Sequence, residues 1–242
     1  MKTQDRIFED LVLVQDSEHL KYGTDALLLS AFVKGNKNAR ALDLGCGNGV
    51  IPLALLHTNK AMSAVGVEIQ ESSAELSLES AQLNGLSARF SVIHGDFTSE
   101  LPLEAGSFDY ATSNPPYMKA DSGRSCKSDH KTMARHEISC DIFSVCKAAA
   151  RYVKFGGDFY VVYRPDRISD LFAALRENRF EPKTVTFVCA RPSLPPCLIL
   201  VSAKLGAMPG GCKVTPTFFI ADEDGKETQA MKDLYQARSM KL

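Results

Sequence analysis

Four consecutive residues, Asn114, Pro115, Pro116 and Tyr117, carry the clearest chemical signal in the sequence, directly after the apolar run 108–112. The side-chain oxygen of Asn114 and the backbone carbonyl of Pro115 are two acceptors that can face one NH2 group. Such a pair pulls the nitrogen toward a tetrahedral shape and frees a lone pair otherwise delocalised into a ring. The prolines stiffen the backbone, and Tyr117 offers a flat face on which an extruded base can stack. We expect a catalytic site for a weakly nucleophilic amine.

A glycine-rich turn, DLGCGNG at 43–49, follows the first buried strand pattern and opens a helix pattern. Gly45, Gly47 and Gly49 allow a tight turn and a close approach of backbone to a ligand, at a helix start whose N–H groups are available. The spacing lacks the third glycine of the dinucleotide fingerprint, and Asp43 would repel a pyrophosphate. Both features argue against a nicotinamide oxidoreductase. They suit a cationic ligand such as the methionine end of S-adenosyl-L-methionine (SAM).

Acidic residues also end the next two strand patterns. Glu68 can accept hydrogen bonds from the two hydroxyls of a ribose, and Asp96 can hold the amino group of an adenine with Phe97 against the ring. Parallel strands gather their carboxyl ends at one edge of a sheet, so Asn114 is expected beside these residues. Together the positions predict a SAM site next to the catalytic motif.

Short apolar runs alternate with helical periodicity, which predicts an α/β fold with a mostly parallel sheet. Strands are expected at 39–44, 63–68, 89–94, 108–112, 158–163, 183–189 and 197–203, with a further edge strand at 218–220 and a short polar helix after it. Helices are expected at 24–34, 50–57, 72–84, 138–153 and 168–175. We expect Thr24 to cap the first helix, a capping box at 72–75, and glycines 156 and 157 to end the long helix.

Composition narrows the function classes. The 242 residues have a formal net charge of −1, so binding of nucleic acid requires a local basic patch. Seven cysteines without paired spacing predict free thiols in the cytoplasm and no metal site. No signal peptide or membrane-spanning pattern is expected. Residues 1–242 are interpreted as one domain.

These motifs together resemble the class I SAM-dependent methyltransferases, in the branch with Asn-Pro-Pro-Tyr. Within this branch the chain resembles the tRNA1(Val) adenine-37 N6-methyltransferase family, on KYGTDALLL at 21–29, ARHE at 134–137 and YRP at 163–165. The resemblance implies a Rossmann-like seven-stranded sheet in the order 3-2-1-4-5-7-6 with helices on both faces. It implies that residues 1–38 cover the cofactor, with Thr24 and Asp25 at the SAM site, and that 205–242 form a C-terminal extension. The implied activity is N6-methylation of an adenine in tRNA.

A stretch rich in basic residues follows the catalytic motif and predicts contact with phosphates around a flipped base. Five basic side chains stand against two acidic ones between Tyr117 and position 136. The expected RNA-binding residues are Lys119, Arg124, Lys127, Lys131 and Arg135, together with Arg164 after the fifth strand.

Several other functions remain open on the sequence. A protein glutamine methyltransferase faces the same delocalised amine, but only 38 residues precede the first strand, which leaves little room for the helical domain of such enzymes. A methyltransferase acting on an amino group in rRNA is a further alternative. A non-catalytic RNA-binding module would be expected to lose Asp43, Glu68 or Asn114, and all three are present. Monomer and homodimer are equally compatible with the sequence.

Overall fold

The computed structural model describes residues 2–8, 10–16, 23–116, 141–237 and 240. Its strands are β1 (Lys2–Ile7), β2 (Leu11–Asp16), β3 (Arg40–Leu44), β4 (Ser63–Glu68), β5 (Phe90–His94), β6 (Phe108–Ser113), β7 (Val153–Tyr163), β8 (Phe180–Cys189), β9 (Leu198–Leu205), β10 (Lys213–Val214) and β11 (Phe218–Phe219). Its helices are α1 (Thr24–Phe32), α2 (Val50–His57), α3 (Glu71–Leu83), α5 (Ile142–Tyr152), α6 (Ile168–Glu177) and α7 (Gln229–Ala237), with a 3-10 turn η1 (Pro165–Arg167).

Within the described residues the central sheet contains nine strands, against the seven and one edge strand at 218–220 that were expected. Its order is β10-β8-β9-β7-β6-β3-β4-β5, and β11 also pairs with β8. Counted from β3, the seven long strands read 3-2-1-4-5-7-6. Only β9 runs antiparallel to its neighbours β7 and β8. β11 lies at the edge strand expected at 218–220, whereas β10 was not expected, because two residues are too short for an alternating pattern.

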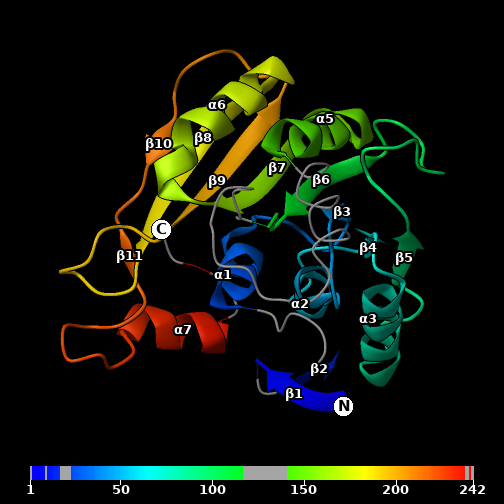
Figure 1. The fold of residues 1–242 in the computed structure, drawn as a ribbon, viewed down its shortest axis with the longest axis horizontal. Coiled ribbons are helices and arrows are strands. Elements are labelled where there is room, and N and C mark those ends of the chain that lie inside the picture. Colours follow the sequence, from blue (N-terminus) through cyan, green and yellow to red (C-terminus); the bar gives the residue numbers. More distant parts are fainter. Residues whose placement is uncertain (1, 9, 17–22, 117–140, 238–239, 241–242) are drawn as a thin grey trace, which may run out of the picture.

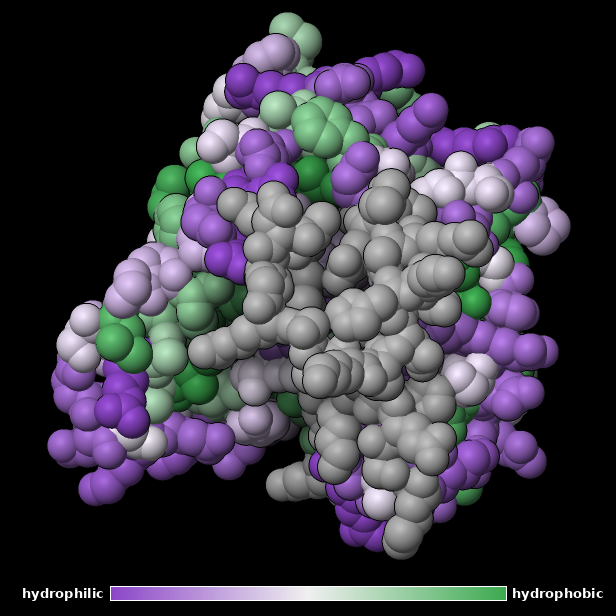
Figure 2. Space-filling model, in the orientation of Figure 1, coloured by the Kyte–Doolittle hydropathy of each residue, from purple (hydrophilic) through white to green (hydrophobic). Residues whose placement is uncertain are grey.

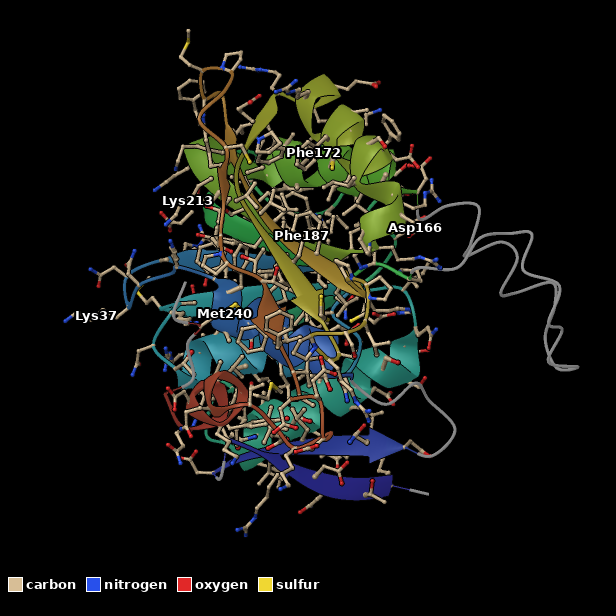
Figure 3. The ribbon with its side chains drawn as sticks, turned by 90° about the vertical axis from the view of Figure 1, so that its left-hand side faces the viewer. Lys37, Asp166, Phe172, Phe187, Lys213 and Met240 are labelled. Atoms are coloured by element: carbon tan, nitrogen blue, oxygen red, sulfur yellow. The ribbon has the colours of Figure 1, made fainter. Side chains whose placement is uncertain are left out.

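Helices cover both faces of the sheet (Figure 1), because successive strand residues point to opposite sides. Ala41 packs in one apolar cluster with α1 and α2, whereas its neighbour Leu42 packs in a second cluster with α5 and α6. Phe172 of α6 and Phe187 of β8 pack at the margin of the second cluster (Figure 3). The C-terminal helix α7 is less polar than expected, since Met231 and Leu234 are buried in the first cluster.

Two predicted helix caps were wrong. Gly23, not Thr24, is the N-cap of α1, and this N-cap makes no side-chain hydrogen bond to the helix start. Helix α3 begins one residue before the expected capping box, with Gln70 as its N-cap, so the 72–75 pair lies inside the first turns. Both differences amount to one or two residues at a helix start, where sequence patterns define a boundary least well.

The expected stop at glycines 156 and 157 was also wrong. Helix α5 ends at Tyr152, and both glycines lie inside β7, where the register with β6 shifts between Phe108 and Tyr110. A Cβ at Gly157 would lie 2.6 Å from the backbone oxygen of Asp109. The glycine pair therefore allows a bulge in a long strand, and local spacing alone does not distinguish this from a helix end.

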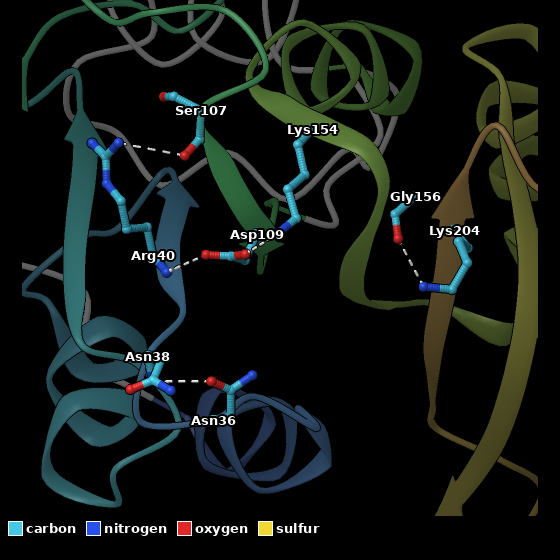
Figure 4. Close-up of polar contacts among 8 residues, drawn as sticks. All are labelled: Asn36, Asn38, Arg40, Ser107, Asp109, Lys154, Gly156 and Lys204. Atoms are coloured by element: carbon cyan, nitrogen blue, oxygen red, sulfur yellow. Dashed lines mark hydrogen bonds and ion pairs between the residues drawn. The ribbon is translucent and has the colours of Figure 1, made fainter.

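Charged side chains tie the strands together at the amino edge of the sheet (Figure 4). Asp109 accepts the backbone N–H of Arg40 at 2.7 Å and is paired with Lys154. Lys204 of β9 donates to the carbonyl of Gly156 at 2.9 Å. Figure 3 views the sheet from its side, with Lys37 and Lys213 toward this edge and Asp166 toward the carboxyl edge. The amino edge is thus stabilised by ion pairs, and the carboxyl edge carries the predicted site residues.

The face of the molecule seen in Figure 1 carries both polar and apolar side chains. Figure 2 shows polar side chains around most of its outline and apolar ones gathered on the left, over the region of β8, β11 and α7. Among the helices that the structure describes, none is long and apolar enough to cross a membrane.

A two-stranded hairpin, β1–β2, packs beside α3 and was not expected from the sequence. The side chain of Asn84 takes the place of a neighbouring strand. Its Oδ1 accepts the N–H of Val12 at 2.9 Å, and its Nδ2 donates to the carbonyl of Val12 at 2.6 Å. Ser80 Oγ accepts the N–H of Val14 at 2.9 Å. The hairpin is therefore fixed to α3 through its backbone.

Replacing Asn84 with Ala should lower the free energy of unfolding by about 1–3 kcal/mol, because two backbone groups of Val12 lose their partners. Urea denaturation followed by circular dichroism measures this change. Gln82→Ala, at an exposed position of the same helix, should stay within about 0.5 kcal/mol of the wild type. Equal stability of both variants would show that the hairpin is not anchored by Asn84.

Candidate active site

A cavity of about 200 Å³ lies at the carboxyl edge of the central strands. Seven residues expected at the cofactor or catalytic site line it together: Gly45, Glu68, Asp96, Phe97, Asn114, Pro115 and Pro116. They come from the ends of β3, β4, β5 and β6, which are neighbours in the sheet. The parallel arrangement thus brings residues up to 71 positions apart in sequence to one cavity.

The glycine turn has the backbone that only glycine adopts easily. Gly45, Gly47 and Gly49 have φ values of 75°, 54° and 83°. A Cβ at Gly45 or Gly47 would meet no atom within 4 Å, so the backbone there is open to a ligand. A Cβ at Gly49 would lie 2.9 Å from the Cβ of Ser77, so this glycine serves packing between α2 and α3.

Glu68 is buried and holds the turn that faces it. Its Oε2 accepts the N–H of Gly47 at 2.8 Å, and its Oε1 accepts the N–H of Gln70 at 2.8 Å. Each carboxylate oxygen has two lone pairs, so both oxygens can accept a further hydrogen bond from a ligand hydroxyl. The side chain is therefore pre-positioned before any ligand arrives.

Asp43 is fully buried behind the turn. Its Oδ1 accepts the hydroxyl of Thr112 at 2.6 Å, and its Oδ2 is a buried oxygen without a hydrogen-bond partner among the described residues. Burial raises the pKa of Asp43, the hydrogen bond from Thr112 lowers it, and the negative charge of Glu68 raises it, which together give a pKa of about 7. A cationic donor would satisfy this oxygen and its charge.

Asp96 and Phe97 form the far side of the cavity and are half-buried. The Oδ1 atom of Asp96 accepts both the N–H and the hydroxyl of Thr98, at 2.8 and 2.7 Å. These two bonds fix the carboxylate at the end of β5. Phe97 packs at the margin of the apolar cluster under α5 and α6.

Asn114 is half-buried between two elements. Its Nδ2 donates to Asp25 Oδ2 of α1 at 3.0 Å, across 89 positions of sequence. Pro115 is buried and Pro116 exposed, so the stiff pair begins in the core and ends at the surface. The carboxamide of Asn114 therefore has a defined partner beside the cavity.

Other predicted site residues lie elsewhere or beyond the described chain. Thr24 is exposed at the start of α1 and does not line the cavity. Arg164, at the end of β7, forms two hydrogen bonds with Asp166, at 2.9 and 3.0 Å. Tyr117 and the basic residues Lys119, Arg124, Lys127, Lys131 and Arg135 fall outside the described residues.

Sequence reasoning missed four positions at this site. Leu44, Ile69 and Gln70 line the cavity next to predicted residues, and Thr112 orients Asp43. The first three follow from their places beside Gly45 and Glu68 at strand ends, which was a usable signal. Thr112 carries no such signal, because its contact with Asp43 depends on the pairing of β3 with β6.

The family model described as methyltransferase small domain matches residues 13–177, more than half of the chain. The chain belongs to this family. Like its members, the protein is a SAM-dependent methyltransferase with SAM as its cofactor. Proteins named tRNA1(Val) (adenine(37)-N6)-methyltransferase are similar to it. The one from Cronobacter sakazakii is 28% identical over 69% of this chain and 68% of its own, and the one from Bacteroides fragilis is 28% identical over 81% of both.

Solved structures share the fold of this methyltransferase. A structure described as a predicted O-methyltransferase from Agrobacterium tumefaciens has a TM-score of 0.73 and 23% identity, covering 90% of this chain and 98% of its own. A geranyl diphosphate methyltransferase in complex with SAM has a TM-score of 0.51 and 16% identity, covering 75% of this chain and 84% of its own. These likenesses place the chain in the α/β fold of class I methyltransferases.

The residues of this methyltransferase fit SAM chemically. The unpartnered Oδ2 of Asp43 suits a cationic group, Glu68 suits the hydroxyls of a ribose, and the open backbone at Gly45 and Gly47 admits close contact. Three or more His, Cys, Asp or Glu side chains arranged for a metal ion do not occur among the described residues.

The stability of this methyltransferase without cofactor should depend on pH through Asp43. Between the ordinary value of 3.8 and about 7, the folded protein keeps a proton on Asp43 that the unfolded chain releases. The free energy of unfolding should therefore fall as pH rises through this window, by up to about 1.4 kcal/mol per pH unit, and level off above it. Urea denaturation at intervals from about pH 4.5 to about pH 7.5 measures the slope.

Asp43→Asn removes this proton and should flatten the slope by the same amount. Asp224→Asn, at an exposed position, is the matched control and should keep the wild-type slope. Identical slopes in the wild type and Asp43→Asn would mean that Asp43 is already ionised at acidic pH.

Proposed function

We propose that this methyltransferase acts on the exocyclic N6 amine of an adenine in tRNA. The observation that carries the proposal is the position of Asn114 and Pro115 on the wall of the cavity that also holds Glu68 and Asp96. The names of the similar proteins from Cronobacter sakazakii and Bacteroides fragilis support tRNA as the substrate. A tRNA substrate also implies work in the cytoplasm.

The site residues explain how such an amine becomes reactive. The side-chain oxygen of Asn114 and the backbone carbonyl of Pro115 accept the two N–H bonds of the amine, which localises its lone pair. SAM supplies a methyl group on a sulfonium sulfur, which is already activated for in-line attack. Because Pro115 is buried and Asn114 is held by Asp25, the acceptors need little reorganisation during the reaction. The amine loses one proton to solvent after transfer.

We assign the cofactor contacts to the residues that surround the cavity. Glu68 binds the ribose, Asp96 and Phe97 bind the adenine ring of SAM, and Asp43 faces its cationic amino-acid end with the turn at Gly45, Gly47 and Gly49. The burial of Asp43 and Glu68 supports this assignment, because buried carboxylates with no ion pair in the described part of the chain favour a cationic and hydroxyl-rich ligand. We also assign Tyr117 as the stacking face for the target base, and Thr24 as a residue that contacts the cofactor.

Incubation with labelled SAM and total tRNA, followed by digestion to nucleosides, tests the substrate. The expected product is N6-methyladenosine, absent with the Asn114→Ala variant. Label in a methylated guanosine, in rRNA alone or in protein glutamine would contradict the proposal and indicate one of the other amine acceptors.

We propose that the basic stretch after the catalytic motif binds the phosphates of the RNA. Changing both Lys127 and Lys131 to Ala should weaken tRNA binding and reduce the salt slope of log K by about 1.5–2, because two phosphate contacts are lost. Filter binding over a range of salt concentrations measures this slope. Arg164, although paired with Asp166, lies at the carboxyl end of β7 and is a further candidate contact.

The matched control changes the same net charge at the amino edge of the sheet. Lys37 and Lys213 are exposed near the amino edge (Figure 3), so Lys37→Ala with Lys213→Ala should leave the slope close to that of the wild type. Equal slopes for the two double variants would show that binding depends on net charge alone.

A further inference from the structure

Asn114 can work as an acceptor only if its carboxamide faces the right way. An amide has an oxygen at one end and an NH2 group at the other, with nearly the same shape. Turned by 180°, the side chain would present two donors to the amine of the substrate and block its activation. Something in the protein must therefore choose between the two orientations.

The carboxylate of Asp25 fixes the orientation of the Asn114 amide. Its Oδ2 lies 3.0 Å from Asn114 Nδ2. An ionised carboxylate only accepts hydrogen bonds, so the NH2 end of Asn114 must face it and the oxygen must point away from it. Hydrogen bonds to a charged acceptor are among the stronger ones in proteins. The reverse orientation would place two acceptors against each other.

The carboxylate of Asp25 is itself fixed by the start of α1. Its Oδ1 accepts the N–H of Ala26 at 2.9 Å, in the first turn of the helix, where the helix dipole stabilises negative charge. Seven consecutive residues of α1, from Ala26 to Phe32, are buried, which anchors the helix in the core. Asp25 is thus attached to a rigid element.

Gly23 provides the room that this arrangement requires. A Cβ at position 23 would lie 2.4 Å from Asp25 Oδ1 and would push the carboxylate from its place. The segment 23–25 therefore combines a residue without a side chain, a helix start and a carboxylate aimed at β6. Asp25 does not line the cavity, whereas Asn114 does.

We infer that Asp25 is a positioning residue, which holds the Asn114 carboxamide with its oxygen toward the substrate amine. The effect of this role on methyl transfer rests on the proposed function. The role differs from the direct contact with SAM that the sequence predicts for Asp25. It makes two separate predictions: one for the state of the Asn114 amide, and one for the rate of methyl transfer.

The first test follows the side-chain amide of Asn114 by 15N NMR of the full chain without tRNA. Its resonance is assigned by its loss in Asn114→Ala. In Asp25→Ala the resonance should shift toward that of a solvent-exposed amide. The control Asp141→Ala removes a carboxylate from the start of α5, where it accepts the N–H of Ser144 at 2.7 Å, and should leave the resonance in place. An unmoved resonance in Asp25→Ala would overturn the inference.

The second test measures single-turnover transfer with saturating SAM, and SAM affinity by calorimetry. Asp25→Ala should slow transfer by about ten-fold or more, the value of one hydrogen bond to a charged group, with SAM affinity within about three-fold. Asp25→Asn should be affected less, because the new amide can still offer an oxygen. A loss confined to SAM affinity would overturn the inference and support direct cofactor binding.

A reciprocal exchange provides the rescue. Asn114→Asp alone places two carboxylates against each other and should lose transfer. Adding Asp25→Asn restores a donor and acceptor in reversed order, and transfer should recover by at least several-fold. No recovery, with both variants folded by circular dichroism, would contradict the inferred pair. If wild-type protein failed to methylate tRNA, the proposed function would fail, while the amide resonance would still decide the role of Asp25.

Discussion

Asn114→Ala should lower single-turnover methyl transfer by about 10²–10³-fold or more while SAM still binds. The substitution removes one of two acceptors that localise the lone pair of the amine, in a site where a pre-placed polar group has its full electrostatic effect. Asn114 lines the cavity, and the substitution leaves the glycine turn and its hydrogen bond to Glu68 in place. Rapid-quench transfer measures the rate, and calorimetry measures SAM affinity, which should stay within a few-fold.

The matched control is Asn38→Ala, the same change at an exposed position before β3, on the amino edge of the sheet (Figure 4). It should leave transfer unchanged. Thermal unfolding of both variants separates lost chemistry from lost folding. Wild-type transfer by Asn114→Ala would remove the basis for assigning this site to amine methylation.

Seven predicted site residues line one cavity because they stand at strand ends. Glu68 and Asn114 each follow a buried apolar run, and in a parallel sheet such positions meet at one edge. In the sheet β3 lies between β4 and β6, so the carboxyl ends of these three strands meet. The positions of the strands and their parallel direction are therefore enough to place Glu68 and Asn114 at the same edge of the sheet.

What the sequence could not supply was contact between distant elements. The hydrogen bond between Asp25 and Asn114 joins the start of α1 to the residue after β6, and the one between Thr112 and Asp43 depends on the register of β3 with β6. The hairpin β1–β2 was not predicted, because its strand β1 is mostly exposed and has no alternating apolar residues. Asn84 gave no hint of its role, because an Asn-Gly pair after a helix is explained equally well by the helix end.

Glu68→Ala should weaken SAM binding by about 100-fold. The carboxylate we assign to the ribose would lose hydrogen bonds worth roughly 1.5–3 kcal/mol each. It also holds the N–H groups of Gly47 and Gln70, so the turn would lose its anchor at the same time. Removing its charge also lowers the pKa of Asp43, which favours ionised Asp43 and offsets a part of the loss. Isothermal titration with SAM measures the net effect.

Two further variants separate the possible causes of that loss. Glu68→Gln keeps one acceptor oxygen and should fall between the wild type and Glu68→Ala. Glu71→Ala removes an exposed carboxylate three positions later, in the first turn of α3, and should bind SAM normally. If Glu68→Ala bound SAM as tightly as Glu71→Ala, the ribose would have to lie elsewhere, and Glu68 would only support the turn. A loss in Glu68→Ala that Glu68→Gln shares in full would instead mean that SAM binding needs both carboxylate oxygens, because each of them also accepts a backbone N–H, from Gly47 or from Gln70.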